Sequence, residues 1–88
     1  METKTNKDKQ NSIIEEIIKE RKKQDEQWGG QEHDDKHVPA DWLVYIMKFM
    51  GRMGQATQHP FEKKVYRDCM IKTAALALAA IESIDRQK

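Results

Sequence analysis

Two cations, Lys48 and Arg52, lie four residues apart in the segment KFMGRMGQA. Residues at this spacing share one face of a helix, so both groups would flank the apolar side chains of the same segment. Lysine and arginine bind phosphate oxygens through charge-assisted hydrogen bonds. The pair therefore indicates either an anion-binding site at the margin of a helical core or two boundary side chains whose charged ends extend into water.

A second group of reactive side chains is HDDKH, residues 33–37. Two histidines with two aspartates can hold zinc. The segment has no apolar period and lies between a glycine pair and Pro39, so we expect a loop over residues 31–39. Because no further cluster of such residues accompanies it, solvation or helix capping is the favoured role, and no metal or other cofactor is expected.

The single cysteine, Cys69, cannot form a disulfide within the chain and fits a reducing compartment, so we expect a cytoplasmic protein. No histidine is placed by the sequence to activate its thiol, which favours a buried structural role. The net charge of +1 gives no overall basic field for nucleic acid. The longest apolar run, residues 74–81, is far shorter than the ~20 residues that cross a bilayer.

Helices must position these groups in a chain of 88 residues, which is short enough for one domain. Residues 1–11 are polar and mixed in charge, and we expect a disordered tail. Ser12 and Glu15 form a capping box that begins the first helix, and isoleucines at helical spacing give this helix one apolar edge. The pair Gly29–Gly30 ends it.

Pro39 fits the first turn of a second helix. One stripe of this helix is apolar and consists of Trp42, Ile46, Phe49, Met50 and Met53. The stripe beside it carries the two cations and consists of Asp41, Tyr45, Lys48, Arg52 and Gln55. Gly51 and Gly54 each weaken the helix by about 1 kcal/mol relative to alanine, and close helix packing is the simplest reason for them.

A third helix is predicted from Pro60 to Asp85, and it is apolar on two sides. One side has Met70, Ala74, Ala77, Ile81 and Ile84, and the other has Val65, Cys69, Leu76 and Ala79. A helix with two apolar sides is buried on both. We therefore expect an all-α fold of three main helices whose bundle is completed by a second subunit, in a dimer or higher oligomer.

Three segments together resemble small phage-type relatives of the MazG family, which are all-α nucleoside triphosphate pyrophosphohydrolases. They are ERKKQDEQWGG in the first helix, DWLVYIMKFMGRMGQA in the second and YRDCMIKTAALALAAIESIDR in the third. The resemblance covers residues 18–86, and it implies a MazG-like helical domain over residues 12–88. It also implies a location in the cytoplasm of an infected bacterial host.

In this family the second helix has a pattern similar to W-L-x-x-x-x-E-E-x-G-E, and the third helix has E-x-x-D. The carboxylates of these glutamates and of the aspartate hold Mg²⁺. Alignment on Trp42 and Gly51 and on Tyr66–Arg67 shows which residues of this chain replace them. They are Lys48, Phe49, Arg52, Cys69 and Lys72. A site lined by cations would repel Mg²⁺, so the resemblance implies that pyrophosphohydrolysis has been lost.

The function expected first is binding of a nucleotide, a cyclic nucleotide or a related phosphate ligand without hydrolysis, which would let the protein sequester a nucleotide signal of host defence. Lys48, Arg52 and Lys72 would bind the phosphate. Either Trp28 or Tyr45 would stack on the base, and either Gln24 or Asp25 would read its edge.

Two other functions stay open. A methionine-rich surface and a lost active site also suit a small helical phage protein that binds and inhibits a host defence or CRISPR-type complex. A Mg²⁺-dependent pyrophosphatase with unusual ligands is the remaining alternative. Its ligands would come from Asp34, Asp35, Asp41 and Asp68.

Overall fold

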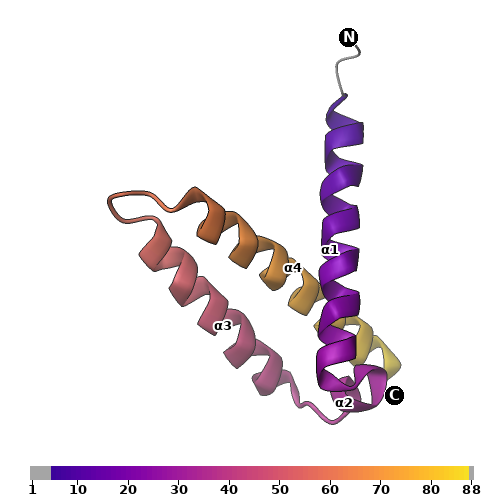
Figure 1. The fold of residues 1–88 in the computed structure, drawn as a ribbon. Coiled ribbons are helices and arrows are strands. Elements are labelled where there is room, and N and C mark those ends of the chain that lie inside the picture. Colours follow the sequence, from indigo (N-terminus) through magenta and orange to yellow (C-terminus); the bar gives the residue numbers. More distant parts are fainter. Residues whose placement is uncertain (1–4, 88) are drawn as a thin grey trace.

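The computed structural model describes residues 5–87, apart from the side chains of Gln31 and His33. Within this range the chain forms no strand and folds into α1 (Asn6–Trp28), α2 (Gly30–Asp35), α3 (Pro39–Ala56) and α4 (Lys63–Arg86). α3 and α4 run antiparallel, α1 crosses the C-terminal half of α4, and the N-terminal half of α1 extends away from both (Figure 1). The expectation of an all-α fold with three main helices is confirmed.

The start of the first helix was predicted wrongly. α1 begins at Asn6 rather than Ser12, so residues 6–11 are helical and not a disordered tail, while residues 1–4 lie outside the described range. Thr5 and Asp8 form the capping box: the Asp8 N–H donates to the Thr5 hydroxyl at 3.1 Å, and the Thr5 N–H donates to the Asp8 carboxylate at 3.3 Å. Polar composition does not oppose a helix whose side chains all remain in water.

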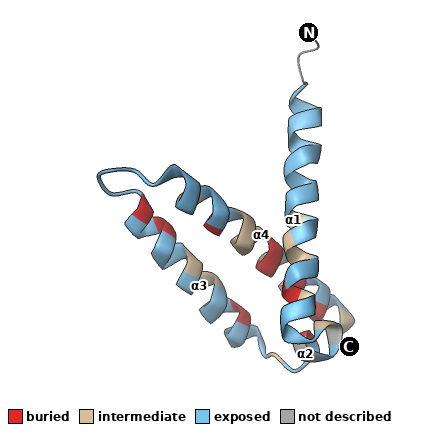
Figure 2. Ribbon diagram, in the orientation of Figure 1, coloured by how far each residue is buried: buried red, intermediate tan, exposed pale blue. Residues whose placement is uncertain are grey.

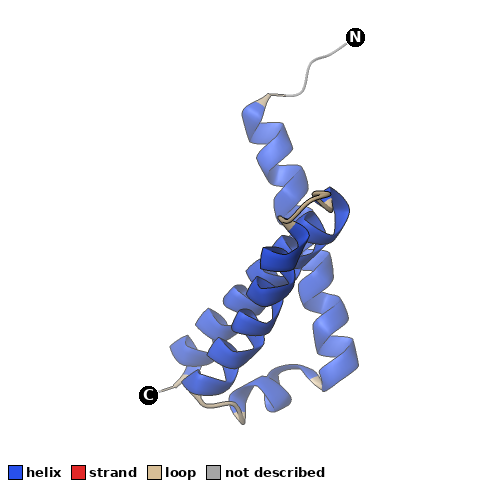
Figure 3. Ribbon diagram, turned by 90° about the vertical axis from the view of Figure 1, so that its left-hand side faces the viewer, coloured by secondary structure: helices blue, strands red, loops and turns tan. Residues whose placement is uncertain are grey.

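The other helix boundaries follow the sequence more closely. Gly29, with a φ of 98°, caps α1, and Pro39 begins α3, both as predicted. The expected loop over residues 31–39 instead contains the short helix α2. α4 starts at Lys63, a little later than predicted. Figure 3 shows that short loops connect the helices.

The core lies between α3 and α4, where Trp42 packs with Leu76 and Ala79 (Figure 2). Ile46 and Phe49 pack against this cluster, so most of the predicted apolar stripe of α3 faces inward. Met50 is the exception, since it is 56% exposed. Cys69 is buried, as expected for a structural thiol.

One side of the α3–α4 pair is apolar and uncovered. We call it the open apolar face, and it consists of the exposed residues Leu43, Met47, Met50, Met70, Ile81 and Ile84. Arg52 on α3 and Lys72 on α4 face α1. Each residue of the open apolar face is rotated by more than about 100° round the helix axis from the cation of its own helix, so it points away from α1. The predicted second apolar side of α4 therefore exists, and no described residue covers it. None of the helices in the described range is long and apolar enough to span a membrane.

The chain exposes more surface than a compact monomer of its size. Its accessible area is 7075 Å², whereas ~5,400 Å² is typical for a folded chain of 10.3 kDa. Its radius of gyration is 15.0 Å, against ~12 Å for a compact domain of this length. The projecting half of α1, whose isoleucines Ile13, Ile14 and Ile18 are exposed, contributes to both differences.

The two glycines of α3 do not mark close packing within the chain. A Cβ atom built on Gly51 or Gly54 would meet no atom within 4 Å. The explanation by tight packing of neighbouring helices is therefore wrong for the described residues.

We predict that Gly51→Ala raises the free energy of unfolding by about 1 kcal/mol, because alanine has the higher helix propensity and the added methyl group meets nothing. Urea denaturation followed by circular dichroism measures the change. Gly30→Ala is the matched control: its Cβ also meets no atom, but its φ of 70° opposes an L side chain, so we expect a loss of about 1 kcal/mol. A destabilised Gly51→Ala would contradict the prediction.

Candidate functional site

A cleft of about 320 Å³ lies where the C-terminal half of α1 meets the middle of α3 and of α4. We call it the cation cleft. Its walls are formed by Glu20, Lys23, Gln24, Gln27, Trp28, Phe49, Arg52 and Lys72. Four of the residues expected to bind a ligand, Gln24, Trp28, Arg52 and Lys72, thus come together from three helices. Lys23, which the sequence analysis missed, adds a third cation.

Phe49 separates the two principal cations of the cleft. The Cζ atom of Arg52 lies 5.5 Å from the centroid of the Phe49 ring, and the Nζ atom of Lys72 lies 5.9 Å from it. Both distances suit cation–π attraction. Lys72 is also paired with Asp68 at 3.0 Å, whereas Arg52 forms no ion pair with any described residue. Arg52 is therefore more available to an anion than Lys72 is.

Gln24 carries an unused acceptor in the same cleft. Its side chain is only 4% exposed, and its Oε1 atom accepts no hydrogen bond from any described residue. A buried polar atom without a partner costs about 1–3 kcal/mol. An N–H or O–H donor supplied by a ligand would remove this cost if the Gln24 side chain turned its Oε1 atom, now buried, toward the cleft.

An aromatic pocket of about 210 Å³ adjoins the cleft, since Trp28 lines both. Its walls are Trp28, Asp34, His37, Trp42, Tyr45 and Leu76. The rings of Trp28 and Tyr45 are nearly parallel, at 18°, with centroids 6.5 Å apart. The centroids of His37 and Trp42 lie 4.9 Å apart. The expected stacking residues Trp28 and Tyr45 are therefore neighbours, and the segment between α1 and α3 supplies a wall through Asp34 and His37.

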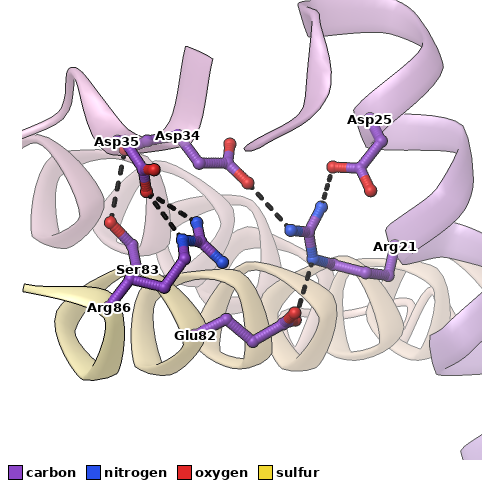
Figure 4. A network of polar contacts seen from close by, with 7 residues as sticks. All are labelled: Arg21, Asp25, Asp34, Asp35, Glu82, Ser83 and Arg86. Carbon is purple, nitrogen blue, oxygen red and sulfur yellow. Dashed lines mark hydrogen bonds and ion pairs between the residues drawn. The ribbon is translucent and has the colours of Figure 1, made fainter. Parts of the chain in front are cut away.

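Arg21 holds the helices that surround both cavities. Its guanidinium donates to Asp25 on α1, to Asp34 on α2 at 2.8 Å and to Glu82 on α4 at 3.3 Å (Figure 4). Burial acts to lower the pKa of Arg21, but the hydrogen bond and charge of Asp25, with the charges of Asp34 and Glu82, outweigh it and raise the pKa above its ordinary value. Asp25, expected to read a base, is held in this cluster and lines neither cavity.

A second arginine fixes the other aspartate of HDDKH. Arg86 donates to the Asp35 carboxylate at 2.7 and 2.9 Å, and the Ser83 hydroxyl donates to the Asp34 carbonyl at 3.3 Å. These contacts tie α2 to α4, which explains why the segment is helical without an apolar period. The aspartates act as structural partners of arginines. No group of three or more potential ligands that could hold a metal occurs among the described residues, and the His33 side chain lies outside them.

The carboxylates considered as unusual Mg²⁺ ligands are also dispersed. Asp34 and Asp35 bind different arginines, and Asp68 pairs with Lys72. Asp41 accepts a hydrogen bond from the Val38 N–H at 3.0 Å and so caps α3.

Of the positions that the MazG resemblance assigns to Mg²⁺, Phe49, Arg52 and Lys72 line the cation cleft. Cys69 is buried in the core. Lys48 lies one turn before Arg52 on α3, is exposed and lines none of the cavities described, so the structure does not bring it into the cleft with Arg52 and Lys72. Cationic and aromatic side chains do not fit Mg²⁺, which takes oxygen ligands.

No family model, curated protein or solved structure matches the chain. The MazG resemblance therefore stays a prediction. The geometry of the cation cleft is the remaining indication of function.

We predict that Arg21→Ala lowers the free energy of unfolding by about 2–3 kcal/mol, because it leaves the Asp34 carboxylate buried without its cation. The loss should be smaller than the ~3–5 kcal/mol of a fully buried pair, since Asp25 and Glu82 still contact water. Urea denaturation provides the measurement.

Arg67→Ala is the matched control for this variant. Arg67 binds Glu16 at 3.0 Å, but both side chains are about half exposed, so its loss should change stability little. Equal effects of the two substitutions would show that the Arg21 cluster has no special role.

Proposed function

We propose that the protein is a catalytically inactive nucleotide-binding protein, with the phosphate in the cation cleft and the base beside Trp28. The observation that carries the proposal is the meeting of Arg52 and Lys72 with a buried, unpartnered Gln24 Oε1 in one cavity. Cations indicate an anionic group, the free acceptor indicates a donor, and the neighbouring aromatic rings indicate a flat apolar group. A nucleotide has all three.

Arg52 is the main phosphate ligand in this proposal. Charge-assisted hydrogen bonds contribute about 1.5–3 kcal/mol each. Lys72 must share its charge with Asp68, so it contributes less than Arg52. Lys23, at the α1 side of the cleft, stands opposite both and completes the cationic wall.

The base stacks on Trp28, which is 41% exposed and lies at the junction of the cleft and the aromatic pocket. Stacking of this kind contributes about 1–3 kcal/mol per base. A rotation of the Gln24 side chain then brings its buried Oε1 atom to an N–H group of the base, from which it accepts a hydrogen bond. Tyr45 supports Trp28 from the side of the pocket.

Hydrolysis is not part of this function, because the cleft has Phe49, Arg52 and Lys72 where the MazG-like pattern has carboxylates. The protein is then a MazG-like pseudoenzyme of phage type that retains a nucleotide without cleaving it. Such a protein would sequester a nucleotide signal of host defence in the cytoplasm of an infected bacterium.

We predict that Arg52→Ala weakens nucleotide binding about tenfold or more, since it removes at least one charge-assisted hydrogen bond. Calorimetric titration with mono-, tri- and cyclic nucleotides measures the affinity. Chromatography of the titrated samples with Mg²⁺ present should return the nucleotides intact.

Lys48→Ala is the matched control, because Lys48 is a cation of the same helix that does not line the cleft. The nucleotide affinity of the Lys48→Ala variant should equal that of the wild type. If the wild type binds none of the nucleotides at millimolar concentration, the proposal fails. Release of pyrophosphate from a triphosphate would disprove the absence of hydrolysis.

The open apolar face is covered by a second copy of the chain in our proposal. The six side chains of this face are all apolar, and each is between 43% and 59% exposed. Contiguous exposed apolar patches often mark a contact with another protein chain. Two α3–α4 pairs packed face to face would form the bundle that one chain leaves incomplete.

We predict a dimer or higher oligomer at micromolar concentration and dissociation by Met47→Glu, which places a charge in the open apolar face. Light scattering coupled to gel filtration reports the mass. Gln58→Glu adds the same charge in the loop between α3 and α4 and should leave the mass unchanged. A monomeric wild type would contradict the proposal.

Binding to another protein is the second candidate function, and the same face favours it. Met47 and Met50 are both more than half exposed, and methionine-rich surfaces adapt to partners of different shape. A small helical protein of this kind would bind and inhibit a host defence or CRISPR-type complex. A monomeric chain that binds no nucleotide would bring this function to first place.

A further inference from the structure

A long groove between α1 and the N-terminal half of α4 continues from the cation cleft. It has a volume of about 670 Å³, and Glu20 and Lys23 line both cavities. The groove and the cleft therefore adjoin, and together they extend from Lys64 near the start of α4 to Arg52 on α3.

The joined surface is cationic although the whole chain has a net charge of only +1. Six basic and three acidic side chains line it, which gives a formal charge of +3. Two of the acids are engaged, since Glu16 binds Arg67 and Asp68 binds Lys72. The cations without an ion pair to any described residue are Lys19, Lys23, Lys64 and Arg52, against the single acid Glu20.

The cations are too widely spaced for a single phosphate. Lys64 and Lys72 are eight residues apart on α4, or ~12 Å along the helix axis. Between these charges, Val65 and Ile71 add apolar side chains to the lining of the groove. A polyphosphate chain would gain nothing from such residues, whereas a nucleoside between two phosphates would cover them.

We propose that the groove binds a second nucleotide unit, so that the ligand is a dinucleotide with one phosphate in the cation cleft and another near Lys19 and Lys64. This inference rests on the proposed function and specifies the class of its ligand. The groove distinguishes the dinucleotide from mononucleotides, which occupy the cleft alone.

The test compares the 5′-phosphorylated dinucleotides pApA and pGpG with AMP, GMP, ATP and GTP by calorimetric titration. The wild type should bind a dinucleotide at least tenfold more tightly than the mononucleotide and the triphosphate of the same base. Lys64→Glu should remove this advantage and leave mononucleotide affinity unchanged. Lys63→Glu is the matched control, because Lys63 makes the same charge change one position away and does not line the groove.

Each outcome decides a different point. Equal affinity for dinucleotides and triphosphates, or a wild-type response in Lys64→Glu, overturns the second subsite and leaves the proposed function standing. Loss of dinucleotide affinity in Lys63→Glu and Lys64→Glu alike shows a general effect of charge and also overturns it. If no nucleotide of any kind binds the wild type, the proposed function itself fails. Thermal melting of the variants confirms that each is folded.

Discussion

The arrangement of this protein depends on one arginine that joins three helices. Arg21 lies in α1 and binds carboxylates from α1, α2 and α4, of which Asp34 is buried. Taking these charges out of water is costly, and only their mutual contact makes it tolerable. Because the geometry of the guanidinium is rigid, the cluster also sets the angle at which α1 crosses α4. That angle brings Gln24 and Trp28, one and two turns further along α1, to the residues of α3 and α4 that complete the cleft.

The cation cleft brings together side chains from three helices. Arg52 has no ion pair among the described residues and lies over an aromatic ring, and a buried amide oxygen beside it lacks a donor. Each feature alone has an ordinary explanation in an exposed helix boundary. Their convergence from three helices is what supports a ligand site. Lys48 occupies the same stripe of α3 and is exposed like Arg52, but it does not line the cleft.

The chain is too small and too open to bury all of its apolar side chains by itself. Its core between α3 and α4 is one layer thick, and α1 covers only one side of it. The other side exposes large aliphatic and methionine side chains from both helices of the pair. The same hydrophobic effect that forms the α3–α4 core therefore favours association through this face, at a site remote from the cation cleft.

The sequence by itself determined the elements whose signals are local. The apolar period of α3, Pro39 at its start and Gly29 at the end of α1 act within a few residues, and each was predictable. The spacing of Lys48 and Arg52 also indicated a cationic stripe, but only the tertiary structure decided that Arg52 joins Lys72 and Gln24 while Lys48 does not. Likewise, α2 has no period of its own and is held by Arg21, Ser83 and Arg86 from distant positions. Such contacts depend on helix crossing angles and loop paths, which no local pattern of residues encodes.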